Sequence, residues 1–157
     1  MKISAQEEYG LRILMRIGQH PNPEGISIPE ISRLEGLSNH YVAKLCRILR
    51  LAGLVKSSRG TSGGYTLAKP SDCIMLNEVL DALGGRLYDE EFCGNHSGML
   101  NLCTNSVDCS IRSLWQIIQI NIDQVLDNIS LQNLLQPAAQ IEKFVPKKHI
   151  QVMKPVK

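Results

Sequence analysis

Two short amphipathic segments between Ser27 and Gly53 constrain the fold of this chain more than any other feature. A serine precedes each segment, at positions 27 and 38, and a glycine follows each, at positions 36 and 53. A serine before a helix accepts a hydrogen bond from a free backbone amide, and a glycine after it adopts the left-handed conformation that ends the helix. The pattern predicts helices over 29–35 and 39–52 joined by a tight turn, which is a helix-turn-helix.

The segments around this unit indicate a small, mainly helical architecture. Ser4 and Glu7 have the spacing of a capping box, which opens a helix that extends to about Gly18. After Gly53 the apolar spacing predicts five further elements, which are hairpin strands over 54–58 and 65–68 and helices over 75–83, 111–129 and 130–135. The hairpin directly follows the second helix of the helix-turn-helix, which is the position of a wing. We therefore expect a mainly α fold with a small β-hairpin wing.

Composition excludes several classes of protein. The chain has 157 residues, of which 43% are hydrophobic, so it can bury a core. No run approaches the roughly 18 apolar residues of a membrane helix, and the first residues do not form a secretory signal, so we expect a cytoplasmic protein. Two Phe and one Trp are too few for a surface that stacks single-stranded nucleic acid. Phosphate-loop, dinucleotide, zinc-protease and serine-hydrolase motifs are missing, and we expect no enzyme.

The charge is distributed unevenly along the chain. The total of +2 combines +5 over residues 1–70, −7 over residues 71–136 and +4 over residues 137–157. A basic segment of this kind indicates a nucleic-acid partner. We expect the basic tail to be a mobile arm that adds salt-dependent, sequence-independent affinity for DNA.

The helix predicted over 39–52 has two chemically different faces. An apolar face carries Val42, Leu45, Leu49 and Ala52, whereas His40, Lys44 and Arg47 lie on the opposite side. Lysine and arginine in a major groove reach guanine O6 and N7 or the phosphates, and the free amides at a helix start bind a phosphate. The expected DNA contacts of this helix are Ser38, Asn39, His40, Lys44 and Arg47.

The expected wing adds a second set of DNA contacts. Arg59 stands beside flexible glycines at the hairpin tip and can enter a minor groove, while Gly60 and Gly63 permit a close backbone approach. The alternative to DNA binding is an ordinary solvent-exposed helix followed by an ordinary hairpin. The combination of helix-turn-helix, wing and local positive charge favours binding of double-stranded DNA.

Three of the five cysteines lie together in an aperiodic loop over 86–110. These are Cys93, Cys103 and Cys109, whereas Cys46 and Cys73 are expected in the core. Soft thiolates select an iron–sulfur cluster, zinc or copper(I), and a fourth ligand would come from His96, Glu8 or Glu7. Glu8 ranks above Glu7 because Glu7 already has a role as a cap. A metal-free thiol–disulfide switch and three unrelated cysteines are the alternatives.

The long helix predicted over 111–129 has an apolar stripe that is longer than a helix packed against one small domain requires. Such a stripe indicates a partner helix. The expected interface residues are Ile111, Leu114, Trp115, Ile118, Ile122 and Val125.

The opening MKISAQEEYGLRIL, the segment over 28–55, the wing RGTSGGY and the three loop cysteines together resemble the IscR/NsrR family of winged-helix transcription regulators that carry iron–sulfur clusters. The likeness covers about residues 1–135. It implies a homodimer joined through the long helix and a cluster, of the 2Fe–2S or 4Fe–4S type, on Cys93, Cys103 and Cys109. In some members an acidic residue on the partner's first helix completes the cluster, and Glu8 stands at the matching position.

Three positions depart from the family pattern. Nine residues separate Cys93 from Cys103, which is longer than the usual spacing. Arg112 stands where members with a histidine ligand carry that histidine, and Ala43 stands where the recognition helix often has an acidic residue. The cluster type and the operator sequence therefore do not transfer from the family to this chain.

These observations lead to one expected function and one expected domain organisation. We expect a homodimeric DNA-binding regulator, acting as a repressor on a palindromic operator, whose binding is controlled by an iron–sulfur cluster that senses redox state, iron or cluster supply, or nitric oxide. The alternatives are a cluster- or zinc-holding carrier or interaction protein and a metal-free thiol-switch regulator. The expected units are a winged helix-turn-helix domain over 1–70, a connecting helix and cysteine loop over 71–110, a dimerisation helix with a short terminal helix over 111–136, and the basic tail over 137–157.

Overall fold

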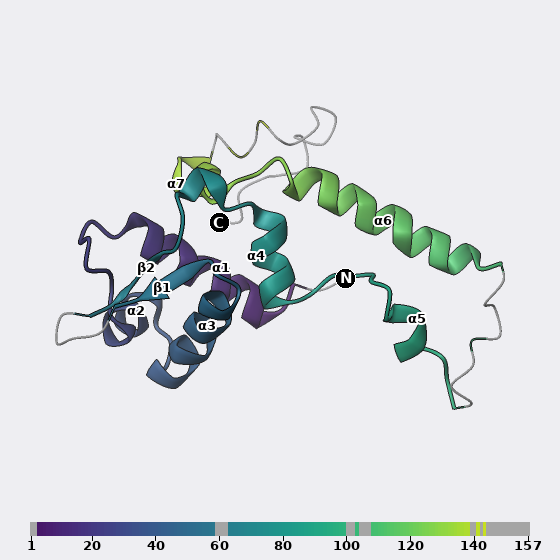
Figure 1. The fold of residues 1–157 in the computed structure, drawn as a ribbon, viewed down its shortest axis with the longest axis horizontal. Coiled ribbons are helices and arrows are strands. Elements are labelled where there is room, and N and C mark those ends of the chain that lie inside the picture. Colours follow the sequence, from purple (N-terminus) through teal and green to yellow (C-terminus); the bar gives the residue numbers. More distant parts are fainter. Residues whose placement is uncertain are drawn as a thin grey trace, which may run out of the picture.

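A computed structural model describes residues 3–58, 63–99, 103, 108–138, 141 and 143 of the chain. Its elements in chain order are α1 (Ala5–Gln19), α2 (Ile28–Glu35), α3 (Asn39–Leu51), β1 (Val55–Ser57), β2 (Tyr65–Leu67), η1 (Ser71–Cys73), α4 (Leu76–Leu83), α5 (Phe92–Asn95), α6 (Ser110–Leu126) and α7 (Leu131–Leu135). The mainly helical fold with one antiparallel hairpin is the predicted one (Figure 1).

The predicted starts of α1, α2 and α3 are confirmed by the capping contacts. Ser4 Oγ accepts from the Glu7 amide at 3.2 Å, and the Glu7 carboxylate accepts from the Ser4 amide at 2.7 Å, which completes the capping box. Ser27 and Ser38 cap α2 and α3 through their hydroxyl groups. Gly36 and Gly53 have φ values of 67° and 71°, so both residues after the short helices lie in the left-handed region.

One hydrophobic core joins α1, α2, α3, β1, α4 and α7. Its fully buried side chains include Ile13, Leu14, Ile31, Val42, Leu45, Leu49, Leu83 and Leu131. We call residues 3–83 and 129–135, which surround this core, the body. Two expected inward residues are exposed instead: Leu34, which is 40% exposed, and Ala52 at the C-cap of α3. Glu35 takes the buried place next to Leu34 because two arginines of α1 bind its carboxylate.

The hairpin is held to the body by close backbone contact. β1 and β2 pair with Val55 opposite Leu67, and Tyr65 also bridges to Ile26 in the loop before α2. A Cβ atom added at Gly64 would lie 2.7 Å from the backbone carbon of Gly25. Glycine is therefore required at position 64 by the chain's own packing.

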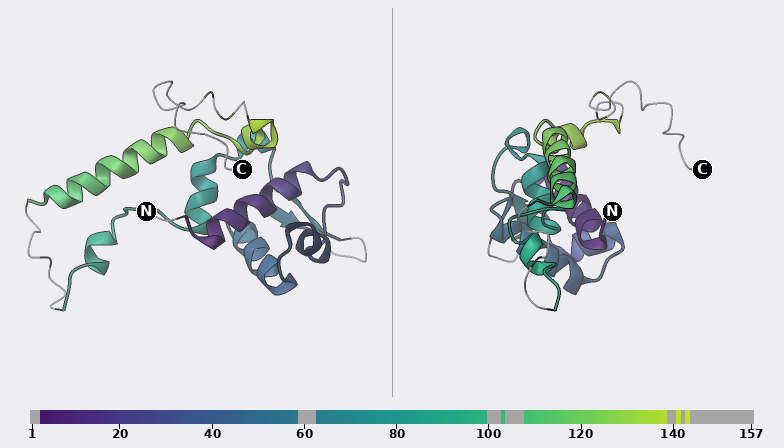
Figure 2. Two further views of the ribbon diagram at one scale, coloured as in Figure 1. Left: turned by 180° about the vertical axis from the view of Figure 1, so that it is seen from behind. Right: turned by 90° about the vertical axis from the view of Figure 1, so that its right-hand side faces the viewer.

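The helix α6 projects away from the body, and the short helix α5 lies on the same side of the body (Figures 1 and 2). We call residues 86–126 the arm. The helix ends at Leu126 rather than at the predicted Ile129, which is buried in the body at 7% exposure. The carbonyl of Ile129 accepts from the Leu76 amide at 2.9 Å, and Ser130 bridges to Met75, so these contacts return the chain to α4.

Candidate DNA-binding surface and cysteine loop

The recognition helix α3 presents the predicted polar face to solvent. Val42, Leu45 and Leu49 are fully buried, whereas the predicted contact residues at the helix start and on its outer face, Ser38, Asn39, His40, Lys44 and Arg47, are all exposed. A shallow hollow of about 440 Å³ lies along this face, between His40, Lys44 and Arg47 and above Ala43. The Ser38 hydroxyl accepts from the Tyr41 amide at 3.2 Å, so this hydroxyl caps the helix.

The base of the wing lies beside the loop that joins α1 to α2. Ser58 Oγ donates to the carbonyl of Glu24 at 3.1 Å and accepts from the Gly64 amide at 3.0 Å. Gly63 is half-buried here, while Arg59 and Gly60 lie outside the described residues. The hairpin is therefore fixed to the helix-turn-helix at its base, on the side of α2.

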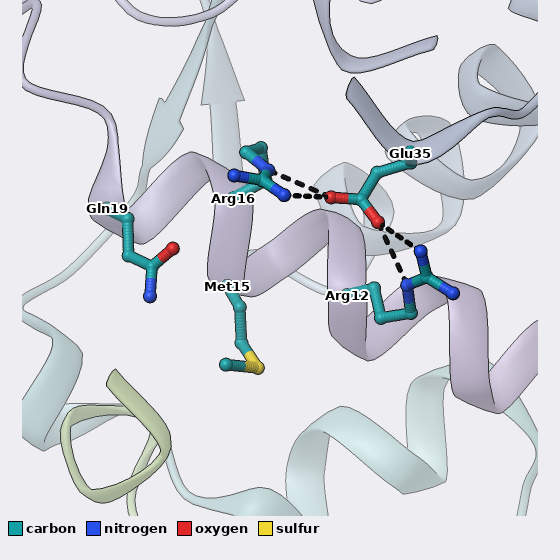
Figure 3. A pocket seen from close by; sticks show the side chains of 5 residues that line it. All are labelled: Arg12, Met15, Arg16, Gln19 and Glu35. Atoms are coloured by element: carbon teal, nitrogen blue, oxygen red, sulfur yellow. Dashed lines mark hydrogen bonds and ion pairs between the residues drawn. The ribbon is translucent and has the colours of Figure 1, made fainter. Parts of the chain in front are cut away.

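A buried carboxylate joins α1 to α2 (Figure 3). Glu35 accepts from Nε and Nη2 of Arg12 at 2.9 and 2.8 Å and from Nε and Nη2 of Arg16 at 2.8 and 2.7 Å. The Glu35 side chain is 3% exposed, and the two arginines are 44% and 38% exposed. We refer to these three residues as the arginine clamp. Sequence reasoning missed it, although Arg12 and Arg16 stand one helical turn apart.

The cysteine loop begins with an aromatic cluster around Cys93. The loop is less irregular than expected, because Phe92–Asn95 forms the short helix α5. The Phe92 ring stacks on His96 at 4.2 Å between centroids and lies 6.5 Å from Trp115 of α6. The Tyr88 hydroxyl is 4.0 Å from the Cys93 sulfur, and burial followed by this contact raises the pKa of Tyr88.

Cys109 caps the arm's long helix in place of Ser110, the residue that we expected to do so. Its sulfur accepts from the Arg112 amide at 3.3 Å. A hydrogen bond to the Cys93 sulfur, followed by the charge of Cys93, raises the pKa of Arg112, and Cys109 contributes in the same direction. Arg112 therefore contacts one loop cysteine through its side chain and another through its backbone.

The described residues do not gather the candidate ligands into one site. Cys103 is half-buried, and no group of three His, Cys, Asp or Glu residues in the described ranges is arranged to hold a metal ion. Glu8 is exposed on α1, while the carboxylate of Glu7 is occupied by the capping box. Cys46 is fully buried as expected, but the expectation for Cys73 is wrong: it is exposed, because it ends η1 at the surface.

The arm's long helix leaves most of its apolar side chains exposed. Gln119 is the one residue of α6 that is buried, whereas exposed fractions reach 61% at Ile111, 51% at Leu114 and 50% at Val125. Trp115, Ile118 and Ile122 are half-buried, and Ile117 and Ile120, which we did not predict, are 58% and 53% exposed.

Comparison with known proteins identifies the group to which this architecture belongs. The family model named Rrf2, an iron-dependent transcriptional regulator, matches residues 3–137. The chain belongs to the Rrf2 family. It is 32% identical over 134 residues to the HTH-type transcriptional regulator CymR of Bacillus subtilis, covering 85% of this chain and 89% of that protein.

Solved structures of other Rrf2 proteins have the same fold. The structure of T. potens IscR has a TM-score of 0.65 and 32% identity, and the match covers 86% of each chain. The oxidized form of Staphylococcus aureus CymR has a TM-score of 0.65 and 29% identity, over 88% of this chain and 98% of that chain. The family resemblance inferred from the sequence is therefore confirmed. The winged-helix fold and the expected class of protein, a transcription regulator, are confirmed as well.

Membership of the Rrf2 family fixes the general activity. Rrf2 proteins are DNA-binding transcriptional regulators, so this chain is a regulator and not an enzyme. None of the helices in the described ranges has the length and hydropathy needed to cross a bilayer.

Proposed function

We propose that this Rrf2 protein is a cytoplasmic homodimer that binds a palindromic operator and represses transcription under the control of an iron–sulfur cluster. The observation that carries the proposal is the place of Cys109. This candidate ligand is also the N-cap of α6, through its 3.3 Å contact with the Arg112 amide. Its sulfur therefore links the chemistry of the loop to the start of the helix proposed to join the two subunits.

The DNA half of the proposal rests on the exposed face of α3. His40, Lys44 and Arg47 enter the major groove, and the start of the helix at Ser38 and Asn39 lies against a phosphate. The wing residues Arg59, Gly60 and Gly63 contact the minor groove. Two such units in a dimer read two half-sites, with a spacing that the dimer sets.

The dimer half rests on the exposed apolar face of α6. An unpaired stripe with Ile111, Leu114 and Val125 at least half exposed is unfavourable in water for a helix that projects from its own body. A second copy of α6 covers the stripe and also brings the partner's first helix near the cysteine loop. The rest of the interface set, Trp115, Ile118 and Ile122, is half-buried within one chain.

The donor chemistry of the loop fits an iron–sulfur cluster. Cys93, Cys103 and Cys109 supply three soft thiolates, and the exposed Glu8 of the partner supplies a carboxylate as the fourth ligand. When bound, a cluster supplies a centre that responds to redox state, to iron or cluster supply, and to nitric oxide. Arg112 and Tyr88 lie against Cys93, where the guanidinium offsets the negative charge of the thiolates.

Regulation then follows from linkage between the loop and the two recognition helices. A change in what Cys109 binds changes the cap of α6, and α6 sets how the two subunits are placed. The affinity for the operator can change only by as much as the two arrangements of the subunits differ in free energy. The residues of this chain that transmit the change are Cys109, Arg112 and the buried Gln119 of α6.

The test is anaerobic purification and reconstitution, followed by absorption and Mössbauer spectra and a gel shift on the gene's own upstream DNA. We expect an iron- and sulfide-containing dimer that loses its spectrum in Cys103→Ala. The exposed Cys73→Ala is the matched control and keeps the spectrum. A colourless, iron-free dimer that still shifts DNA would remove the cluster and leave the DNA-binding role.

A metal-free thiol switch is the second candidate, favoured by the common neighbour of Cys93 and Cys109. Arg112 contacts both residues, and a solved Rrf2 relative is described as an oxidized form of CymR. In this case the two thiols lose two electrons and two protons to a low-molecular-weight disulfide and form one S–S bond. Peptide mapping of protein treated with that oxidant would show a Cys93–Cys109 cross-link, and operator binding would change without iron.

A further inference from the structure

The arginine clamp stands at the junction between the first helix and the helix-turn-helix. Glu35 is the last residue of α2, directly before the Gly36 turn that leads to α3. A carboxylate that is 3% exposed is stable only where cations and hydrogen bonds replace its water, and each of its oxygens accepts from two nitrogens of one arginine. The clamp thus fixes the turn of the DNA-binding unit to α1.

The two arginines make the same ion pair but differ in their other contacts. The Arg12 guanidinium lies 5.5 Å from the centroid of the Tyr9 ring. The cation–π contacts found in the described part of the chain involve Arg12 and Lys44 and do not include Arg16. Arg12 and Arg16 are therefore a matched pair, because one residue has an aromatic neighbour and the other does not.

The aromatic contact continues from α1 to the recognition helix. The Tyr9 ring meets the Tyr41 ring edge-on, at 6.1 Å between centroids and an interplanar angle of 85°. The Lys44 ammonium lies 6.0 Å from the centroid of the Tyr41 ring on the outer face of α3. Arg12, Tyr9, Tyr41 and Lys44 thus form a continuous series of contacts from the clamp to the proposed DNA-contacting face.

The geometry points to Arg12 as a positioning residue for DNA recognition. Arg12 holds Tyr9 against Tyr41, and the Tyr41 ring holds the stem of Lys44 in one direction. A free lysine side chain loses rotamer entropy when it is fixed, so a lysine that is already oriented binds a phosphate or base with a smaller loss. This inference rests on the proposed function, in which Lys44 contacts the operator.

The test compares Arg12→Gln with Arg16→Gln in the full-length protein. Fluorescence anisotropy measures the Kd for a duplex from the gene's own upstream region at several salt concentrations. We expect the Kd to rise about tenfold for Arg12→Gln and about twofold for Arg16→Gln, since only the first variant frees Lys44. The slope of log Kd against log salt should fall by about 0.9 for Lys44→Gln, which removes the charge, and stay unchanged for Arg12→Gln and Arg16→Gln, in which Lys44 keeps its charge.

Two variants of Tyr9 separate positioning from general stability. Tyr9→Phe keeps the ring and should leave the Kd within twofold, whereas Tyr9→Leu should reproduce the loss seen with Arg12→Gln. Equal effects of Arg12→Gln and Arg16→Gln on the Kd would show that the clamp only stabilises the fold, and would overturn the inference. An unchanged Kd for Lys44→Gln would overturn the proposed role of Lys44 and this inference together.

Discussion

The body and the arm of this protein use apolar side chains in opposite ways. In the body, α1, α3 and α4 bury their apolar faces in one shared core. In the arm, α6 has one buried residue, Gln119, and exposes isoleucines and leucines along most of its length. The body therefore buries its apolar core within a single chain, whereas the arm has an exposed apolar surface suited to packing against a second copy. The difference separates the residues that hold the fold from those proposed to set the assembly.

The largest effect that this comparison predicts is the loss of stability when a core leucine is truncated. Leu45→Ala should lower the free energy of unfolding by about 3 kcal/mol, because Leu45 is fully buried and its truncation leaves a cavity. Leu114→Ala in the arm, where the side chain is 51% exposed, should cost less than about 1 kcal/mol in the monomer. Urea unfolding at nanomolar concentration measures both values. Equal losses would mean that α6 is part of the same core.

The next effect concerns the association of two chains. Leu114→Glu places a charge on the exposed stripe of α6, and we expect the dimer Kd to rise at least about 30-fold, or about 2 kcal/mol. Gln116→Glu adds the same charge at an exposed polar position and is the control. Analytical ultracentrifugation measures both variants. A dimer that tolerates the change at Leu114 would place the interface on another surface.

The same contrast explains what the sequence could predict. The body follows local rules: serine caps, glycine ends and apolar spacing predicted α1, α2, α3 and the hairpin with small errors at their ends. The errors arose where long-range contacts decide. Glu35 is buried because arginines from α1 reach it, and Cys73 is exposed because η1 lies at the surface.

The candidate site was predictable in its residue types but not in its geometry. The exposed face of α3 follows from helical periodicity, so the exposure of His40, Lys44 and Arg47 was predicted correctly. The cap of α6 by Cys109 and the approach of Arg112 to Cys93 depend on how a loop without periodicity folds. Such contacts have no regular spacing in the sequence, so the sequence did not predict them.

A smaller effect is expected where the segment before α5 is held against α6 within the arm. Gln119 accepts from the Tyr88 amide at 3.1 Å and donates to Asp123 at 2.8 Å, and Asp123 binds Arg86. Gln119→Leu leaves the Tyr88 amide without its acceptor, so the local opening free energy should fall by about 1 to 2 kcal/mol. Hydrogen exchange at Tyr88 should then be about tenfold faster. The exposed Gln116→Leu should leave that rate unchanged, and equal rates in both variants would remove Gln119 from this role.

The smallest effect distinguishes the buried Cys46 from the more exposed cysteines of the body and the arm. Burial raises the pKa of Cys46 from 9.0 to about 12, so folding favours the neutral thiol. This contribution is complete below pH 9 and is lost as the pH rises toward 12, because the unfolded chain ionises first. The free energy of unfolding should fall by about 1 kcal/mol between pH 8 and pH 10. Burial, followed by the charge of Cys46, also raises the pKa of Tyr65.

The control for the pH effect is Cys46→Ala, which lowers stability by itself but should make it nearly independent of pH over the same range. Alkylation of the native protein gives a second measurement, since the thiolate is the reactive form. Cys73, which is exposed, and Cys93 and Cys103, which are half-buried, should react well before Cys46. If Cys46 reacts as fast as Cys73 at pH 8, the core around α3 opens readily. Burial in the core would then give the thiol of Cys46 no protection from alkylation.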